Sequence, residues 1–118
     1  MLGWGIEIYR EVPGGRSKEA LLASWHAGLG GLDWIEALVK QGHAIDLGGD
    51  GYPCHYKVTV ANLLPSITSG PPLHTGPMVI GDDYVLPAGW IGNVRIDYEK
   101  IAACSPDEWL VIEAWDQS

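Results

Sequence analysis

Apolar and polar residues alternate along several short stretches of the chain, which is the pattern of strands with one buried face. Residues 2–10 are the clearest example, with Trp4, Ile6 and Ile8 on one side of the expected strand. Residues 109–115 are too apolar and β-rich for a solvent-facing helix, and we expect a near-central strand there. Shorter stretches with strand character are residues 44–47, 78–80, 84–86 and 94–98. Residues 55–61 are expected to form a strand or a strand that enters a helix turn.

Two segments are predicted to form short helices. The first covers residues 17–25, where Ser17 can act as the N-cap. The second covers residues 34–41, and Gly42 follows it in the position of a left-handed C-terminal glycine. Residues 62–77 contain four prolines and two glycines, and we expect a long irregular loop there.

These elements predict a single α+β domain over residues 1–118, with a mostly antiparallel sheet and two short helices packed on one face. Cys54 and Cys104 show no Cys-x-x-Cys spacing, and we expect both to be thiols that are mostly buried. No apolar run approaches the roughly 18 residues that suggest a membrane span. The N-terminus lacks a basic region followed by an apolar one. We therefore expect a cytoplasmic protein without a membrane partner.

Charge limits the classes of partner. Seven Lys and Arg against fifteen Asp and Glu give a net charge of −8. Eight of the acids lie in residues 82–118, together with only two of the bases. Such a chain is repelled by nucleic-acid phosphates, so direct nucleic-acid binding is not expected. An electropositive protein is the expected partner, and its docking site is expected in this C-terminal part.

Carboxylates and aromatic residues meet at two expected turns. Carboxylates on turns steer a basic partner toward the surface, and Tyr or Trp anchors beside them hold the complex. The alternative is that Asp and Gly only satisfy turn geometry while Tyr and Trp pack inward. The predicted partner-binding residues are Asp46, Asp50, Tyr52, Asp82, Asp83, Tyr84 and Trp90.

No catalytic or metal signature is found. The segment 46–57 resembles the start of a calcium loop, but Lys57 stands where the bidentate Glu should be. Four residues offer possible zinc ligands: His43, Asp46, Cys54 and His55. Their spacing matches no metal signature, and Cys54 and His55 are adjacent, so in a strand they would point to opposite faces. Neither a nucleophile elbow nor a phosphate-binding loop is present. We expect no catalytic residues, metal or cofactor; a small hydrolase or metal-dependent enzyme using residues 43–55 stays as an alternative.

Three stretches resemble small acidic immunity proteins of bacterial polymorphic-toxin and contact-dependent inhibition systems. They are the stretches Gly3–Arg10, Gly31–Glu36 and Pro106–Trp115. The resemblance implies a non-catalytic inhibitor that binds a cognate toxin in the cytosol of the producing cell. It carries over no functional residue, because immunity families differ in their binding surfaces.

The expected function is therefore that of an acidic inhibitor of a toxin, and a nuclease with a basic cleft is the expected target. Its carboxylates would occupy the positions that substrate phosphates take. A phage or mobile-element accessory protein that binds a host factor is a second hypothesis. Homodimerisation through an exposed sheet edge is compatible with either.

Overall fold

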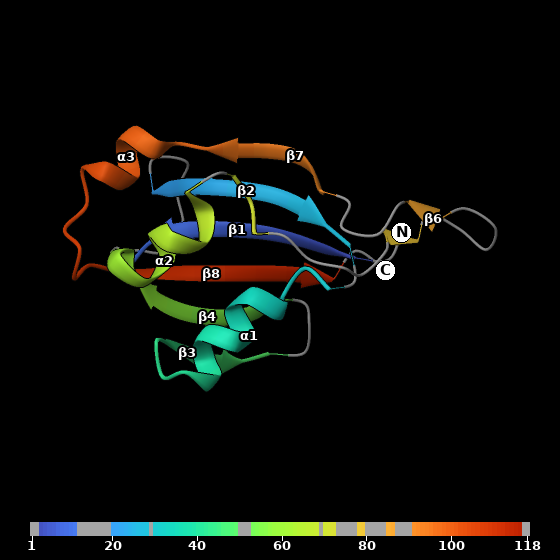
Figure 1. The fold of residues 1–118 in the computed structure, drawn as a ribbon, viewed down its shortest axis with the longest axis horizontal. Helices are drawn as coiled ribbons and strands as arrows, with labels where there is room; N and C mark the ends of the chain where they lie inside the picture. Colours follow the sequence, from blue (N-terminus) through green and yellow to red (C-terminus); the bar gives the residue numbers. More distant parts are fainter. Residues whose placement is uncertain are drawn as a thin grey trace.

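A six-stranded antiparallel sheet forms the centre of the computed structural model (Figure 1). The structure describes residues 3–11, 20–28, 30–49, 53–68, 70–72, 78–79, 85–86 and 91–116, the pairs 78–79 and 85–86 by their backbone only. The strand order is β3-β4-β8-β1-β2-β7. The six strands are β1 (Trp4–Arg10), β2 (Leu21–Ala27), β3 (Ala44–Gly48), β4 (Cys54–Thr59), β7 (Ile91–Ile96) and β8 (Trp109–Asp116). A separate pair consists of β5 (Met78–Val79) and β6 (Val85–Leu86).

Three helices complete the described fold: α1 (Asp33–Lys40), α2 (Val60–Ile67) and α3 (Tyr98–Ala102). Figure 1 shows α1 and α2 lying over the same face of the sheet, with α3 beyond the end of β7. Each helix contributes to one hydrophobic core, through Ile35, Leu63 and Ile101 respectively. The predicted α+β class is confirmed, and α3 is a helix that the sequence pattern did not predict.

Alternation along the strands divides the sheet into an inner face, which meets the helices, and an outer face. On the inner face Ile8 of β1 stands opposite Ile112 of β8, and Tyr56 of β4 stands opposite Ile112 on its other side. Ile8 and Ile112 are fully buried. Burying each of these side chains stabilises the fold by roughly 1.5–3 kcal/mol.

The strands expected at residues 2–10 and 109–115 are confirmed as β1 and β8. β8 has β4 and β1 as its neighbours, so its near-central position is also confirmed. The helix at residues 34–41 is confirmed as α1, and Gly42 has the left-handed φ of 79°.

The helix predicted over residues 17–25 is wrong in its described part. Residues 21–27 form β2, which pairs with β1 on one side and β7 on the other. Leu and Ala favour helix as isolated residues, but hydrogen bonding to two strands and burial of Trp25 outweigh that weak preference. Ser17 lies outside the described residues.

The loop predicted over residues 62–77 is wrong at its start, because α2 continues to Ile67 with Pro65 inside it. Proline removes one helical hydrogen bond. Burial of Leu63 and Ile67 in the core offsets this loss. The hydroxyl of Tyr98 donates to the carbonyl of Ile67 at 2.7 Å, which gives the end of the helix a partner.

Candidate functional site

The structure describes one of the predicted partner-binding residues, Asp46. It is exposed on β3, and its Oδ1 accepts a hydrogen bond from the backbone N–H of Gly48 at 2.7 Å. The other predicted residues lie outside the described part of the chain, so their role stays a prediction: Asp50, Tyr52, Asp82, Asp83, Tyr84 and Trp90.

β3 forms one edge of the sheet and presents apolar side chains to solvent. Within the described sheet it pairs only with β4. Ile45 and Leu47 are 46% and 52% exposed, one on each side of Asp46 in the sequence. An unpaired strand edge with exposed apolar side chains is the kind of surface on which another protein chain docks.

A second carboxylate, that of Glu36, belongs to α1, the helix that packs against β3. Burial, together with the charges of Cys54, Glu36 and Asp46, raises the pKa of Tyr56 to about 12. Because Glu36 and Asp46 both act on the Tyr56 hydroxyl, α1 and β3 bring their carboxylates to the same part of the molecule. We call Glu36, Ile45, Asp46 and Leu47 the acidic edge.

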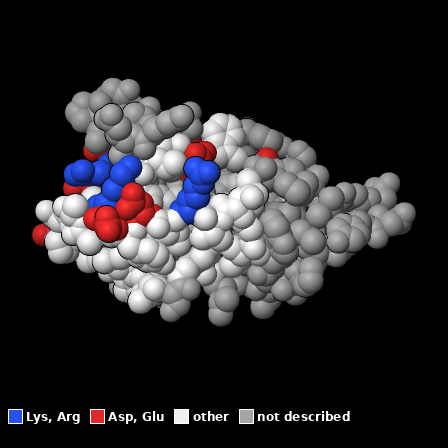
Figure 2. All heavy atoms as spheres, turned by 90° about the horizontal axis from the view of Figure 1, so that it is seen from above, with Lys and Arg blue, Asp and Glu red and all other residues white. Residues whose placement is uncertain are grey.

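The lysine opposite Ile45 is already paired. Lys57, opposite Ile45 in the register, forms an ion pair with Glu11 at 2.8 Å. At the opposite edge of the sheet, on the side of β7 and α3 that Figure 2 shows, basic and acidic side chains are gathered together rather than forming a field of one sign.

Polar residues cross the outer face in one register position, on five neighbouring strands. We call this set the polar row. It consists of His55 on β4, Glu113 on β8, Glu7 on β1, Ser24 on β2 and Arg95 on β7.

The two carboxylates of the polar row are directly opposite each other, an arrangement that is unfavourable unless other groups compensate. The Tyr9 hydroxyl donates to Oε2 of Glu7 at 2.6 Å. Nε2 of His55 lies 3.9 Å from Oε1 of Glu113, whose side chain is only 5% exposed. These contacts fix both carboxylates in place.

Next to the polar row the outer face is hollow. Gly5 of β1 stands between Trp115 on β8 and His26 on β2. On its other side, His26 pairs with Gly92 of β7. Because Gly5 has no side chain, a groove of about 430 Å³ remains between the larger residues. Its lining includes Gly5, Glu7, Ser24, His26, Arg95 and Trp115. We call it the outer groove.

The rim of the outer groove contains an unusual backbone conformation. Asn93 has a φ of 52°, the one positive φ among the described residues other than glycine. It lies beside an irregularity of the β2–β7 ladder between Ser24 and His26, and its side-chain amide is 2.7 Å from Nδ1 of His26. Such conformations cost free energy and are concentrated at functional sites.

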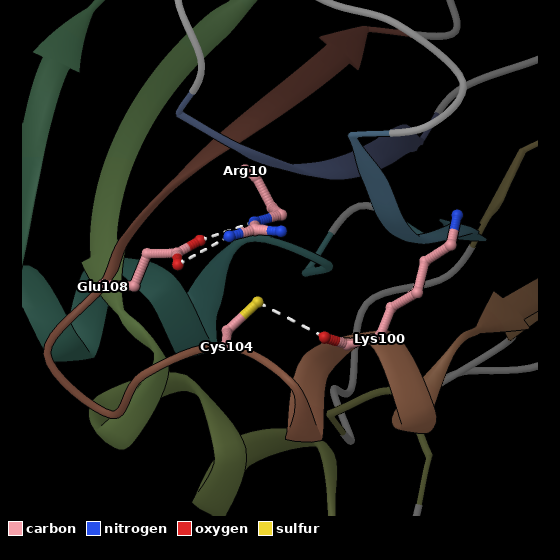
Figure 3. Close-up of polar contacts among 4 residues, drawn as sticks. All are labelled: Arg10, Lys100, Cys104 and Glu108. Atoms are coloured by element: carbon pink, nitrogen blue, oxygen red, sulfur yellow. Dashed lines mark hydrogen bonds and ion pairs between the residues drawn. The ribbon is translucent and has the colours of Figure 1, made fainter.

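A third cluster lies at the end of β1 (Figure 3). Arg10 donates from Nε and Nη2 to the two carboxylate oxygens of Glu108, at 2.8 and 2.9 Å. This pairing lowers the pKa of Glu108. Cys104 donates from Sγ to the carbonyl of Lys100 at 3.3 Å, and burial raises the pKa of its thiol. A protonated, buried thiol is a poor nucleophile. The cluster is therefore structural: its Arg10–Glu108 pair ties the loop after α3 to β1.

The described residues give no support to a metal site at positions 43–55. Among them no three His, Cys, Asp or Glu side chains gather as ligands. Cys54 pairs with Ala114 and His55 with Glu113, so these adjacent residues lie on opposite faces, as predicted. Neither Cys54 nor Cys104 forms a disulfide, and the prediction of two thiols is confirmed.

The polar row was missed at the level of the sequence. Alternation alone puts Glu7 on the outer side of β1. Its alignment with Glu113 and Arg95 at one register position depends on the pairing of strands that are about a hundred residues apart in the sequence. The local pattern contains no signal for that pairing.

None of the helices in the described ranges has the length and apolar character needed to cross a membrane. Comparison with protein-family models, with curated proteins and with solved structures gives no match to this chain.

Proposed function

We propose that the protein is a binding inhibitor that docks a basic partner protein on its acidic edge. The observation that carries the proposal is the exposure of Ile45 and Leu47 on an edge strand beside Asp46. A partner strand added to β3 gains main-chain hydrogen bonds, and the two apolar side chains are buried at the contact. Asp46 and Glu36 then face the partner's Lys and Arg side chains.

The net charge of −8 supports a basic partner, because opposite charge speeds encounter and selects against acidic proteins. In this proposal the partner is a cognate toxin of nuclease type, and the inhibitor acts in the cytoplasm of the producing cell. The carboxylates occupy the place of substrate phosphates in the basic cleft. Asp82 and Asp83 are predicted to add to the negative charge that attracts the basic partner.

A capture experiment with matched variants tests the proposal. The wild-type chain, the double variant Ile45→Ser/Leu47→Ser and the control Val94→Ser are immobilised and exposed to lysate of the source organism. Val94 is a suitable control because it is 47% exposed on β7, at the opposite edge of the sheet. We expect a basic protein retained by the wild type and the control, lost from the double variant, and loosened by salt.

The captured protein is then purified and its activity measured with increasing amounts of the chain. Stoichiometric inhibition by the wild type and the Val94→Ser control, with at least tenfold weaker inhibition by the double variant, supports the proposal. Equal inhibition by all three chains refutes docking on β3. If wild-type chains instead form dimers in light scattering and the double variant is monomeric, β3 is a self-association edge.

A further inference from the structure

The outer groove combines a hollow with opposite charges at two of its sides. Glu7 on β1 and Arg95 on β7 both line it, and Ser24 on the strand between them is small. The Cα positions of β1 and β7 are roughly 10 Å apart, two strand spacings. No ion pair joins Glu7 and Arg95, and none joins Arg95 to any other described carboxylate.

Both charged groups are therefore available to a ligand. Arg95 presents a planar set of donors suited to a carboxylate. Glu7 is an acceptor held in position by the Tyr9 hydroxyl at 2.6 Å. A ligand with only a negative charge would be attracted by Arg95 but repelled by Glu7. A ligand with only a positive charge would be attracted by Glu7 but repelled by Arg95. A molecule with both charges satisfies both groups.

The remaining lining indicates the rest of the ligand. Trp115 forms an apolar side of the groove, and Gly5 leaves room beside it. When the Asn93 amide donates to Nδ1 of His26, the histidine proton is on Nε2, a second donor for a carboxylate. A groove of about 430 Å³ is at the small end of the roughly 300–1,000 Å³ range of ligand sites.

We propose that the outer groove binds a free α-amino acid with an apolar or aromatic side chain. Its carboxylate pairs with Arg95, its ammonium group pairs with Glu7, and its side chain packs on Trp115. This site is separate from the acidic edge, so it does not depend on the proposed inhibitor function.

Titration of the isotope-labelled chain by NMR tests the assignment with L-phenylalanine and L-leucine as probes. Two analogues of phenylalanine each lack one charge: phenethylamine has no carboxylate and 3-phenylpropionate has no ammonium group. We expect saturable shifts at the Gly5 and Ser24 amides and the Trp115 indole with the amino acids. We expect at least tenfold weaker binding of both analogues, because each of them lacks one of the two charged pairings.

Variants assign the two charges. Arg95→Gln and Glu7→Gln are each expected to weaken amino-acid binding at least tenfold, whereas the matched controls Lys40→Gln and Asp33→Asn, at exposed positions of α1, leave it unchanged. Gly5→Val is expected to abolish binding by filling the groove. Thermal melting verifies that each variant folds; if Gly5→Val does not, the charge variants decide.

Three results would overturn the assignment: no saturable shift with either amino acid, equal binding of the one-charge analogues, or full binding by both charge variants. Partner capture by Arg95→Gln separates this test from the previous one. It is expected to equal that of the wild type, so the groove and the acidic edge succeed or fail independently.

Discussion

The two faces of the sheet are built from alternate residues of the same strands, yet they have opposite chemistry. On the inner face Ile8 and Ile112 are adjacent and fully buried. One residue along, Glu7 and Glu113 are adjacent on the outer face. Burial of the inner residues fixes the register, since a slip of one position would move every apolar side chain to the wrong face. The same register assembles the polar row, so the core determines the geometry of the outer groove.

The largest expected effect comes from truncating neighbouring residues on the two faces of β8. Ile112→Ala leaves a cavity in the core and is expected to lower the free energy of unfolding by about 3 kcal/mol. Val111→Ala, one position away on the partly exposed outer face, is expected to lower it by less than about 1 kcal/mol. Urea unfolding measures both. Similar losses from the two variants would show that the outer face is packed as tightly as the inner one.

The sequence predicts the strands that carry a pattern of their own and misses those that depend on their neighbours. β1 and β8 were predictable because their apolar residues produce a pattern within the strand itself. β2 was not, because its strand conformation depends on pairing with β1 and β7 rather than on the propensity of Leu21 or Ala23.

Prediction of the candidate sites has the same limit. Asp46 was predicted from its charge beside an expected turn, and it is exposed on β3. Glu36 was not predicted, because its place beside β3 depends on how α1 packs on the sheet. The polar row depends on pairings across five strands, which no local pattern encodes.

Tyr56 probes the inner face next to the acidic edge. Its pKa is raised to about 12 in the folded protein, from an ordinary value of 10.0. The folded state therefore retains the phenolic proton where the unfolded chain has lost it. The associated stability is complete below pH 10 and is lost as the pH rises from about 10 to about 12, on the order of 2 kcal/mol.

Removing the hydroxyl tests that account. Tyr56→Phe is expected to flatten the decline of stability between pH 10 and pH 12, as measured by urea unfolding at a series of pH values. Tyr98→Phe is the control, because Tyr98 is exposed on α3 and its hydroxyl donates to the end of α2. If the free energy of unfolding of Tyr56→Phe falls between pH 10 and pH 12 as steeply as that of the wild type, the inner face near β3 is accessible to water.

The smallest effect is expected at the boundary of the inner face, where Arg10 pairs with Glu108 (Figure 3). The pairing lowers the pKa of Glu108 below its ordinary value of 4.5. A carboxyl group with a lowered pKa in the folded state contributes stability that is present above pH 4.5. That contribution is lost as the pH falls through the lowered pKa.

Glu108→Gln should therefore lower stability slightly at pH 7 and reduce the loss of stability on acidification below pH 4.5. Asp107→Asn is the matched control, because it changes the charge of a neighbouring exposed residue outside the ion pair. Because Arg10 is exposed and Glu108 is partly exposed, salt should weaken the effect of Glu108→Gln at pH 7. If the free energy of unfolding falls equally below pH 4.5 in Glu108→Gln and in the wild type, the ion pair only orients the loop after α3. The inner face alone would then determine stability at this end of the sheet.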